Sequence, residues 1–600
     1  MRQLLEQVSF WSDQEVLRGV GNEMETIRLT IDGQAVEAAA DQTVLQAARA
    51  AGCGIPTLCY CPSLKPTGSC RVCLVEVQGM RSLATACTLP VSDGMTVFTN
   101  TPKVRQARRG VVELLLSDHP AECLTCNRSG SCELQSVAHN LGIRDLPYGG
   151  SMGERSLDSS NPSILRDMRK CISCRRCVEV CSQVQGVSAL GASRRGFETQ
   201  IGPAFGDKLG QVACALCGQC VLVCPTGALT EQDSTGKVWQ ALADPDKVVV
   251  VQIAPAIRTT IGEEFGLPPG TPLVGELVEG LRRLGFHKVF DTDFAADLTI
   301  MEEGTELLHR LQSGGKLPLI TSCSPGWVKY CEHFYPELLP NLSSCKSPQE
   351  MFGAVMKNWY AGKHDLDPQK VFVVSVMPCT AKKFEITRPE LATTGAPDVD
   401  AVLTTRELAG MFKEAGLVLP NLPKAEFDQP LGESTGAAVI FGATGGVMEA
   451  ALRTVYELVT GQTLRQLEFA QVRGLEGIRE AEVQLAGKTV RLAAAHGLGN
   501  AKALLERIKA GPGDYTFVEI MACPGGCIGG GGGPRPTDQA RRALRAEALY
   551  QLDRQLPLRK SHANPAIQAL YRDLGEPGGE AAHKLFHTHY HSRSGSNCQE

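Results

Sequence analysis

Cysteine is the residue type whose spacing carries most of the chemistry in this chain. The sequence contains 24 cysteines, and three of them end apolar runs: Cys323 in LPLITSC, Cys379 in VFVVSVMPC and Cys523 in YTFVEIMAC. Cys527 follows Cys523 after Pro-Gly-Gly. In a compartment that keeps thiols reduced, so many cysteines indicate metal or redox chemistry rather than disulfides.

Buried strands must position these thiols. After about residue 245, near-continuous Val, Ile and Leu runs alternate with helix-like segments, which is typical of a mostly parallel α/β sheet covered on both faces. Ligands of such sheets bind beyond the carboxyl ends of the strands. We therefore expect the four cysteines to converge there as ligands of a buried 4Fe–4S cluster. The runs are KVVVVQIAP, HKVFDTDF, LPLITSC, VFVVSVMPC, AAVIFGATGG, VRLAAAHG and YTFVEIMAC.

The N-terminal cysteines predict a 2Fe–2S site. A hairpin pattern around Asp32-Gly33 precedes four cysteines. Cys70 and Cys73 form a close Cys-x-x-Cys pair, with Cys59 before it and Cys87 after it. Four thiolates in a Gly-rich loop on a small sheet suit a 2Fe–2S cluster, and zinc is the alternative. The spacing resembles the plant-type ferredoxin domain, and Cys53 and Cys61, outside it, are expected to be buried thiols. The predicted ligands are Cys59, Cys70, Cys73 and Cys87.

A histidine stands before three cysteines in HPAECLTCNRSGSC. This order resembles the His-ligated 4Fe–4S module found in hydrogenases and in the large iron–sulfur subunit of respiratory complex I. A neutral imidazole in place of one thiolate should raise the reduction potential, and a Cys3His zinc site is the alternative. The ligands would be His119, Cys123, Cys126 and Cys132.

The segments CISCRRCVEVC and CALCGQCVLVCP repeat the spacing Cys-x2-Cys-x2-Cys-x3-Cys. This doubled motif is typical of a two-cluster ferredoxin domain, in which the fourth cysteine of each run serves the other cluster. One 4Fe–4S cluster would use Cys171, Cys174, Cys177 and Cys224. The other would use Cys214, Cys217, Cys220 and Cys181. Together with the two sites above, these clusters indicate an electron-transfer chain that passes single electrons.

Charge and hydropathy exclude other classes of function. The net charge of -5 over 600 residues does not suggest binding to nucleic acid or to a membrane surface. No apolar run approaches the roughly 20 residues of a membrane helix, and the N-terminus lacks the apolar block of a signal peptide. We expect residues 1–24 to form an amphipathic helix that either caps its own domain or docks to a partner subunit. The expected location is the cytoplasm.

The stretches TSCSPGW, MPCTAKKFE and EIMACPGGCIGGGGGP resemble the three signature stretches of iron-only, or [FeFe], hydrogenases. The likeness runs from about residue 25 to 590 and includes FGATGGVMEAALRT. RKSHANPAIQALY and HKLFHTHY resemble the small-subunit segment of that family. The order of the accessory cluster motifs also matches the long form of the family.

The resemblance implies an H-cluster, which is a 4Fe–4S cube joined through one cysteine to a two-iron unit with CO and cyanide ligands, and the reaction 2H⁺ + 2e⁻ ⇌ H₂. Cys527 matches the bridging cysteine, and Cys379 and Cys523 match cube ligands. Lys382 matches a lysine that hydrogen-bonds cyanide, whereas Glu385 is its ordinary alternative partner. The residues expected to pack beside the two-iron unit are Met377 and Met521.

The resemblance also implies a path for protons. Glu303, Glu306 and Arg310 are spaced i, i+3 and i+7, so they share one helical face. Together with Ser343 they resemble the proton path of the family. The alternative is a solvated helix face with an internal ion pair.

The sequence departs from the family pattern at two places. The family usually has two adjacent cysteines, a proton relay and then a cube ligand, where this chain has Cys323 and Ser324. A serine alkoxide is a poor ligand for iron–sulfur iron, so we expect a local backbone adjustment in which Cys323 ligates and Ser324 helps to pass protons. The reverse assignment stays open, and Cys345 is a remote third candidate. Ala256 stands where the family often has a serine that donates to cyanide.

HGLGNAKALL contains only two of the three glycines of a dinucleotide fingerprint, so we expect no nucleotide site in this chain. Long family members of this layout resemble the catalytic subunit of NAD(P)-linked, often electron-bifurcating, complexes. The expected partners are flavoprotein and small ferredoxin-like subunits, soluble ferredoxin and maturation enzymes. The alternatives are a stand-alone ferredoxin-linked hydrogenase, a complex I-like electron carrier, and a sensory or iron–sulfur assembly relative without turnover.

The predicted fold is multidomain, α+β and α/β. It comprises the N-terminal helix, a β-grasp 2Fe–2S domain, the His-ligated module, the two-cluster ferredoxin domain, a two-lobed α/β parallel-sheet catalytic domain and a small-subunit-like segment. The corresponding ranges are 1–24, 25–100, 101–145, 146–244, 245–545 and 546–600.

Overall fold

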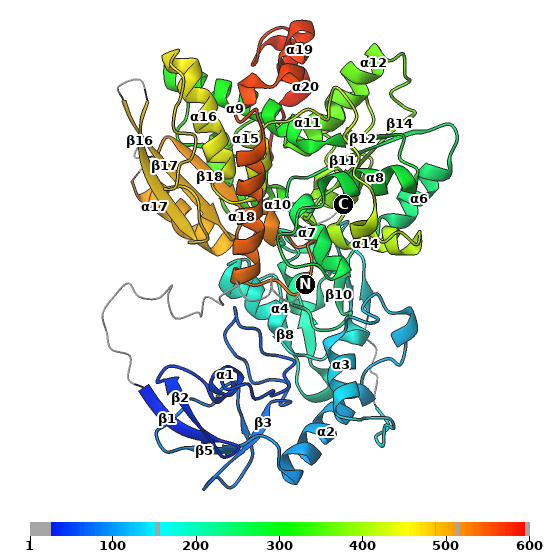
Figure 1. Cartoon of the computed structure of the whole chain (residues 1–600), viewed down its shortest axis with the longest axis vertical. Coiled ribbons are helices and arrows are strands. Elements are labelled where there is room, and N and C mark those ends of the chain that lie inside the picture. The colour runs from blue at the N-terminus through cyan, green and yellow to red at the C-terminus, as the bar shows by residue number, and fades with distance from the viewer. Residues whose placement is uncertain (1–25, 151–155, 486–487, 512–514, 594–600) are drawn as a thin grey trace, which may run out of the picture. The chain divides into compact units, whose positions relative to one another are not determined.

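The computed structural model describes residues 26–150, 156–485, 488–511 and 515–593 (Figure 1). The helix predicted for residues 1–24 lies outside these ranges. The chain forms two compact units. Unit 1 comprises the chain up to Tyr60, Pro66–Asp118 and Gly130–Gly150, and unit 2 comprises Cys61–Lys65, His119–Ser129 and the chain from Ser151 onward. Within the described ranges, every helix is too short or too polar to cross a bilayer.

Unit 1 is built on a five-stranded mixed sheet with the strand order β2-β1-β5-β3-β4. The predicted hairpin is present: β1 (Thr26–Ile31) pairs antiparallel with β2 (Gln34–Ala39) across Asp32 and Gly33, which both have positive φ. β5 pairs parallel with β1 and antiparallel with β3. The remaining elements are α1 (Val44–Ala50), β3 (Leu74–Val77), β4 (Ala84–Thr85), β5 (Thr96–Phe98), α2 (Pro102–Ser117) and α3 (Glu133–Asn140).

The doubled cysteine motif of unit 2 forms two similar turns that lead into short helices. Arg175 and Gly218 both have left-handed backbone conformations, and they directly precede α4 (Arg176–Glu179) and α5 (Gln219–Val223). Each helix therefore begins immediately before the third cysteine of its run. The small sheets of this region contain β6 (Leu157–Asp158), β7 (Ile164–Asp167), β8 (Gly191–Ser193), β9 (Gln200–Gly202) and β10 (Leu229–Glu231).

A four-stranded parallel sheet with the order β12-β11-β14-β15 follows. Every residue of β14 (Val371–Val376) is buried, as the continuous apolar run predicts. The other strands are β11 (Val248–Ile253), β12 (Lys288–Asp291) and β15 (Ala401–Leu403). The helices of this region include α6 (Thr235–Ala243), α7 (Ile257–Thr260), α8 (Val274–Leu284), α9 (Thr292–Ser313), α11 (Pro348–Ala354) and α14 (Thr405–Glu414).

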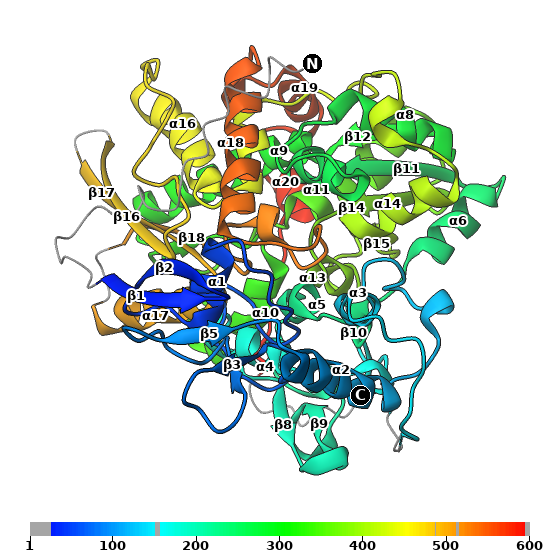
Figure 2. The same cartoon turned by 60° about the horizontal axis from the view of Figure 1, so that its bottom comes forward.

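A second sheet has the order β13-β18-β17-β16, and it is mixed. β13 (Leu319–Ile320), β18 (Phe517–Met521) and β17 (Lys488–His496) are parallel, but β16 (Ile478–Leu485) pairs antiparallel with β17. Three of its four strands are parallel, as expected of a mostly parallel sheet, and the edge strand β16 is antiparallel because only two residues separate it from β17, whereas a parallel crossover needs a dozen or more. In Figures 1 and 2 the two large sheets lie on opposite sides of α18 (Gln539–Gln555).

One predicted strand is helical. The apolar segment AAVIFGATGG forms α15 (Gly436–Val439) and a 3-10 turn at Ile440–Gly442. A short buried apolar run does not distinguish a strand from a helix by its pattern. Small residues allow close helix packing here, since a Cβ on Gly436 would lie 2.2 Å from a carboxylate oxygen of Asp553 on α18.

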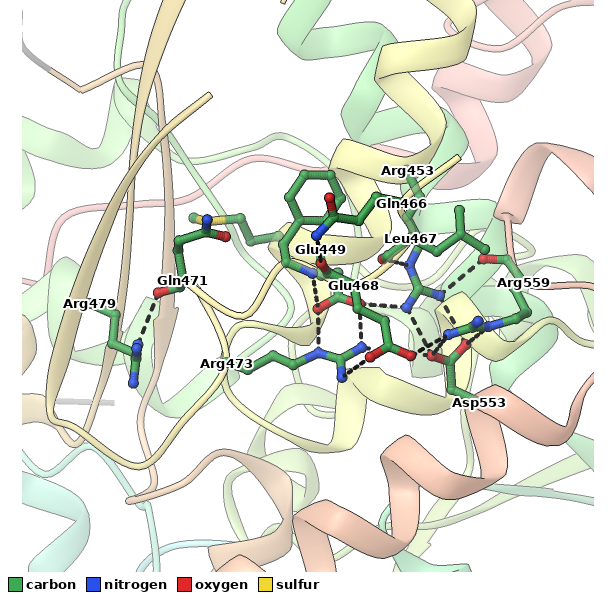
Figure 3. Close-up of polar contacts among 12 residues, drawn as sticks. Glu449, Arg453, Gln466, Leu467, Glu468, Gln471, Arg473, Arg479, Asp553 and Arg559 are labelled. Atoms are coloured by element: carbon green, nitrogen blue, oxygen red, sulfur yellow. Dashed lines mark hydrogen bonds and ion pairs between the residues drawn. The ribbon is translucent and has the colours of Figure 1, made fainter. Parts of the chain in front are cut away.

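A buried ion-pair network joins α16 (Gly446–Thr460) to α18 (Figure 3). The fully buried guanidinium of Arg453 donates to both carboxylate oxygens of Asp553 at 2.9 and 2.8 Å and also pairs with Glu449. Arg473 donates to Glu449 at 2.7 Å, and Arg559 donates to Asp553 at 2.7 Å. The network therefore fixes the small-subunit-like segment to the catalytic region.

Replacing Arg453 by Met should lower the free energy of unfolding of unit 2 by about 3 kcal/mol, because two buried carboxylates lose a shared cation. Urea unfolding followed by tryptophan fluorescence measures this, since Trp239, Trp327 and Trp359 all lie in unit 2. The matched control is Arg554→Met on α18, whose pair with Glu547 is exposed and should contribute about 0–1 kcal/mol. Equal effects of the two substitutions would contradict the importance of the network.

Candidate active site

The cysteines at the strand ends share one cavity. Its empty volume is about 780 Å³, and the chain segments directly after β11, β12, β13, β14 and β18 contribute to its walls. Cys323, Cys379, Cys523 and Cys527 all line it. The two sheets therefore direct their carboxyl ends to a single place, which is where α/β sheets bind ligands. Other lining residues are Pro255, Thr292, Met377, Lys382, Phe441 and Met521.

Burial disfavours the charged thiolate form of these cysteines unless a cation is nearby. Burial and the neighbouring thiols raise the pKa of Cys527 to about 12, and they raise the pKa of Cys523 further. Burial also raises the pKa of Cys379. A positively charged soft metal would favour the thiolate form. Four convergent thiols in one cavity are the donor set that an iron–sulfur group needs.

Glycines around Cys527 permit close backbone contacts. Gly525 and Gly526 have φ of 80° and 89°, and a Cβ on Gly526 would lie 2.9 Å from the amide nitrogen of Thr444. A Cβ on Gly530 would lie 2.0 Å from the carbonyl oxygen of Pro378. The glycines are needed because the chain segments that carry the cysteines press against each other.

Cys323 and Ser324 face different surroundings. Ser324 precedes α10 (Pro325–Phe334), and its Oγ accepts a hydrogen bond from the amide of Ala522 at 3.2 Å, next to Cys523. The thiol of Cys323 has its pKa raised by burial and then by the charges of Glu303, Glu519 and Cys527. Cys323 therefore lies on the side of the cavity that holds the buried carboxylates.

Lys382 lies in α13 (Ala381–Glu385), lines the cavity and has two polar partners. Its Nζ donates to Glu385 Oε2 at 2.7 Å and to Ser347 Oγ at 2.7 Å. The ordinary carboxylate partner foreseen from the sequence is thus present. Met377 and Met521, each 4% exposed, line the same cavity, whereas Ala256 is buried in the packing of α18 and does not line it.

The predicted proton-path residues lie together behind Cys323. Burial and then the charge of Glu306 raise the pKa of Glu303 to about 8, and its Oε2 has no hydrogen-bond partner among the described residues. Ser343 Oγ donates to Glu306 Oε2 at 2.8 Å, and Arg310 pairs with the other oxygen of Glu306 at 2.5 Å. These residues form a polar chain that is buried at Glu303 and Ser343 and part-buried at Glu306 and Arg310, whose side chains are each 13% exposed, so it is not a fully solvated helix face.

Cysteines of the doubled motif form two groups. Cys171, Cys174, Cys177 and Cys224 line one cavity with an empty volume of about 420 Å³. In the second group, burial and the charges of Cys214 and Cys181 raise the pKa of Cys220. Burial raises the pKa of Cys217, as do the charges of Cys523, Cys220 and Cys214. The structure therefore places the fourth cysteine of each run with the other run.

Cys217 connects the second group to the large cavity, which the sequence did not foresee. Cys217 lines that cavity, and the thiol of Cys523 approaches its carbonyl oxygen at 3.9 Å. Gln219 Nε2 donates to the carbonyl of Gly529 at 2.9 Å, and Thr380 Oγ1 donates to that of Leu216 at 2.8 Å. The doubled motif indicates two metal groups, but its spacing carries no signal for which one faces the catalytic region.

The first four predicted ligands lie together in unit 1. Hydrogen bonding to Cys70 and Cys87 lowers the pKa of Cys59 to about 2, and hydrogen bonding to Cys87 lowers the pKa of Cys73 to about 7. The amide of Cys59 also donates to Cys70 Sγ at 3.4 Å. Such mutual contacts of four thiols suit a shared metal group. Cys53 and Cys61, which were expected to be buried thiols, are only half-buried.

The His119 motif is divided between the units. His119, Cys123 and Cys126 belong to unit 2, and Cys132 belongs to unit 1. A Cβ on Gly227 would lie 2.9 Å from Cys126 Sγ, so Cys126 approaches the chain just after Cys224. The motif therefore reaches the region of the first ferredoxin-like group.

Family models match five parts of the chain. They are described as iron only hydrogenase large subunit, C-terminal domain (residues 247–531), iron hydrogenase small subunit (539–593), 2Fe-2S iron-sulfur cluster binding domain (24–102), NADH-ubiquinone oxidoreductase-G iron-sulfur binding region (108–147) and NADH-quinone oxidoreductase subunit 3, ferredoxin-like domain (161–230).

Two relatives match nearly the whole chain. The NADP-reducing hydrogenase subunit HndD of Solidesulfovibrio fructosivorans is 51% identical over 95% of this chain and 100% of its own length. Iron hydrogenase 1 of Clostridium pasteurianum is 40% identical over 94% of this chain and 100% of its own length. Among solved structures, a variant of apo HydA1 from Chlamydomonas reinhardtii has a TM-score of 0.54 and 48% identity, and the match covers 60% of this chain and 99% of that one.

Proposed function

The chain belongs to the iron-only, or [FeFe], hydrogenases, which are oxidoreductases acting on H₂, and we propose that its catalytic centre is the apolar cavity lined by Cys379, Cys523 and Cys527. The observation that carries this proposal is the meeting of these thiols, from strands far apart in the sequence, in one cavity together with Cys217. When bound there, the H-cluster supplies the redox chemistry of 2H⁺ + 2e⁻ ⇌ H₂.

Each lining residue has a proposed role. Cys379, Cys523 and Cys527 would hold the H-cluster, with Cys527 shared between the cube and the two-iron unit. Met377 and Met521 provide apolar packing that excludes water. Lys382 supplies a buried positive charge, held by Glu385 and Ser347 at 2.7 Å each. Burying both ions of the Lys382–Glu385 pair costs free energy unless further hydrogen bonds satisfy their remaining donors and acceptors. A cyanide ligand would accept such a hydrogen bond from Lys382.

Protons would reach the cavity along the buried chain of Arg310, Glu306, Ser343, Glu303 and Cys323. Among these five residues, Glu303 has the carboxyl that can hold a proton near neutral pH, because burial raises its pKa to about 8. Cys323 lies between Glu303 and Cys527, as the charges acting on its thiol indicate. We therefore assign the last proton donor to Cys323 and the position beside the cube to Ser324, which reverses the assignment favoured from the sequence.

Ser324→Cys tests this assignment. A fourth thiolate should slow the loss of cube iron to a chelator several-fold, because thiolate is a better iron ligand than a serine alkoxide. The matched substitution Cys323→Ala should keep the cube and lose most turnover. If instead Ser324→Cys leaves iron release unchanged and Cys323→Ala loses the cube, Cys323 is the ligand. Iron release is followed by the absorbance of the chelate.

The remaining clusters are proposed as one 2Fe–2S cluster on the β-grasp sheet of unit 1, one 4Fe–4S cluster at His119, Cys123, Cys126 and Cys132, and two 4Fe–4S clusters at the doubled motif. The contact between Cys217 and Cys523 supports the second of these two as the accessory cluster nearest the catalytic cavity. We also propose that the domains have the limits predicted from the sequence and that the catalytic domain is a two-lobed α/β domain.

The relative HndD is named as a subunit of an NADP-reducing hydrogenase. We propose by analogy that this chain works with flavoprotein and small ferredoxin-like subunits that handle a nicotinamide nucleotide, and that it does so in the cytoplasm, where its thiols stay reduced. The second candidate is a stand-alone ferredoxin-linked enzyme, because the relative iron hydrogenase 1 matches over its whole length and its name mentions no other subunit. Purification of the native complex and identification of its subunits distinguishes the two.

The hydrogenase function itself is tested by co-expression with the maturation enzymes. We expect H₂ uptake with a viologen dye and infrared bands of CO and cyanide. A protein with intact accessory clusters but neither turnover nor these bands would be only an electron carrier.

A further inference from the structure

A group of metal-ligating side chains lies next to the proposed proton path. Glu306, Cys345 and His587 each offer a ligand atom, and these atoms lie within 4.8 Å of one another. We propose that the three side chains bind one Zn²⁺ ion and that the bound ion stops proton transfer through Glu306. The inhibitory part rests on the proposed function, whereas zinc binding does not depend on it.

The donor set is one that zinc prefers. Zinc accepts thiolate sulfur, imidazole nitrogen and carboxylate oxygen, and three protein ligands with a water in the fourth position form a common site. Cys345 Sγ lies 3.9 Å from Glu306 Oε2. This spacing is close to the separation of two ligands around a tetrahedral ion whose bonds are about 2.0–2.3 Å long.

Backbone contacts bring the three residues together from distant parts of the sequence. Glu306 lies in α9, Cys345 precedes α11, and His587 directly follows α20 (Glu580–Phe586). Cys345 and His587 form an isolated antiparallel bridge, and the amide of Thr588 donates to the carbonyl of Ser344 at 2.7 Å. The small-subunit-like segment thus completes the site, which is preorganised by main-chain pairing.

The electrostatic field at this place favours a cation. Burial raises the pKa of the Cys345 thiol, and the nearby carboxylates of Glu306, Glu302 and, once it is ionised, Glu303 raise it further. Arg310 pairs with Glu306 at 2.5 Å and offsets part of this negative charge. His587 Nε2 lies 3.0 Å from Glu302 Oε2, and the ring of His583 stacks on that of His587 at 4.4 Å. A divalent ion would compensate the remaining charge.

Zinc binding replaces existing contacts and involves no redox change. The ion displaces the proton of the Cys345 thiol, which leaves to solvent, and it replaces one hydrogen bond of His587, either to Ser344 Oγ at 2.8 Å or to Glu302 at 3.0 Å. Glu306 would exchange its bond from Ser343, now 2.8 Å long, for a bond to the metal. A carboxylate held by zinc is no longer available to accept and return a proton, so the path is interrupted at Glu306.

Zinc K-edge X-ray absorption tests the site, because iron clusters do not contribute at that edge. The matured holoenzyme is incubated with ZnCl₂ and freed of excess metal by gel filtration. We expect one equivalent of zinc with one sulfur and otherwise nitrogen and oxygen ligands, with unchanged iron content. Cys345→Ser, which keeps the size of the side chain, should lose the sulfur ligand, and Cys345→Ala serves as a second variant if the first is unstable.

The control is the double variant His589→Asn, His591→Asn, because these histidines form an exposed ring pair at 4.7 Å that could bind surface zinc. It should leave the sulfur-ligated zinc unchanged. Zinc without a sulfur ligand, four sulfur ligands, or uptake that Cys345→Ser does not alter would overturn the site.

Inhibition is measured separately as dye-linked H₂ uptake, with each variant referred to its own metal-free rate. Half-inhibition of Cys345→Ser should need at least about tenfold more zinc than the parent protein, in line with the 10- to 100-fold cost of weakening a metal site. Sulfur-ligated zinc without inhibition would overturn the block at Glu306. If the protein had no hydrogenase activity, the zinc spectrum would still decide the site, so the two failures are distinguishable.

Discussion

Glu303→Gln should lower H₂ turnover by about 10²- to 10⁴-fold, the range expected for loss of a positioned proton-transfer group. Glutamine has nearly the same size as glutamate but cannot give up and regain a proton. Glu303 is 2% exposed, and its neighbours are Cys323 on the cavity side and Ser343 on the other side. Turnover is measured with a viologen dye, and iron content and the CO and cyanide bands should stay unchanged.

Glu302→Gln is the matched control, because the neighbouring carboxylate is also fully buried but has other partners. Glu302 accepts hydrogen bonds from Tyr571, from the amide of Gly578 at 2.9 Å and from His587. Its replacement should reduce stability more than turnover. Equal losses of turnover in the two variants would contradict a specific role of Glu303 in proton transfer.

The raised pKa of Glu303 also gives a pH dependence. The carboxyl is protonated at neutral pH and ionises as the pH passes about 8. A protonated-carboxyl infrared band that disappears with this midpoint, and that is missing in Glu303→Gln, would identify it. The same shift makes the free energy of unfolding depend on pH. The folded state holds a proton that the unfolded state releases near pH 4.5, so stability falls as the pH rises from 4.5 to about 8.

Cys527→Ala should abolish turnover and remove the CO and cyanide infrared bands. The substitution takes away the sulfur proposed to join the cube to the two-iron unit, whereas Cys379 and Cys523, which line the same cavity, are proposed as ligands of the cube alone. The accessory clusters should keep their electron paramagnetic resonance signals, because their proposed ligands are untouched.

Cys331→Ala controls for the loss of a buried thiol as such. Cys331 is fully buried in the core around α10, and its Sγ lies 3.4 Å from the carbonyl oxygen of Tyr335, away from the cavity. We expect a loss of about 1 kcal/mol in stability from the small void, with normal iron content and normal bands. Retention of the CO and cyanide bands in Cys527→Ala would refute the assigned role of Cys527.

The arrangement around Cys217 would keep the proposed accessory cluster close to the proposed catalytic cavity. Gly218 has a positive φ, and a Cβ there would lie 2.4 Å from Thr380 Oγ1. The glycine therefore allows the second cysteine run to press against the segment that carries Cys379. Hydrogen bonds from Gln219 and Thr380 fix this contact without charged groups.

The sequence alone determined the features that depend on neighbouring residues. Three such features are the Cys-x2-Cys-x2-Cys-x3-Cys runs, the Asp32-Gly33 hairpin and the shared helical face of Glu303, Glu306 and Arg310. Each is formed by residues close together in the sequence, so the residue pattern alone predicts it. The buried strands were also visible, and their carboxyl ends indicated where Cys379 and Cys523 would meet.

Only the tertiary structure decided which surroundings each side chain has. Adjacent residues such as Cys323 and Ser324 face different partners, Glu303 on α9 and Ala522 after β18 respectively, which come from distant parts of the sequence. The helical form of residues 436–442, the antiparallel edge strand β16 and the approach of Cys217 to Cys523 likewise depend on chain segments far away in the sequence. Contacts of this kind arise from long-range packing, which a local pattern of residues does not encode.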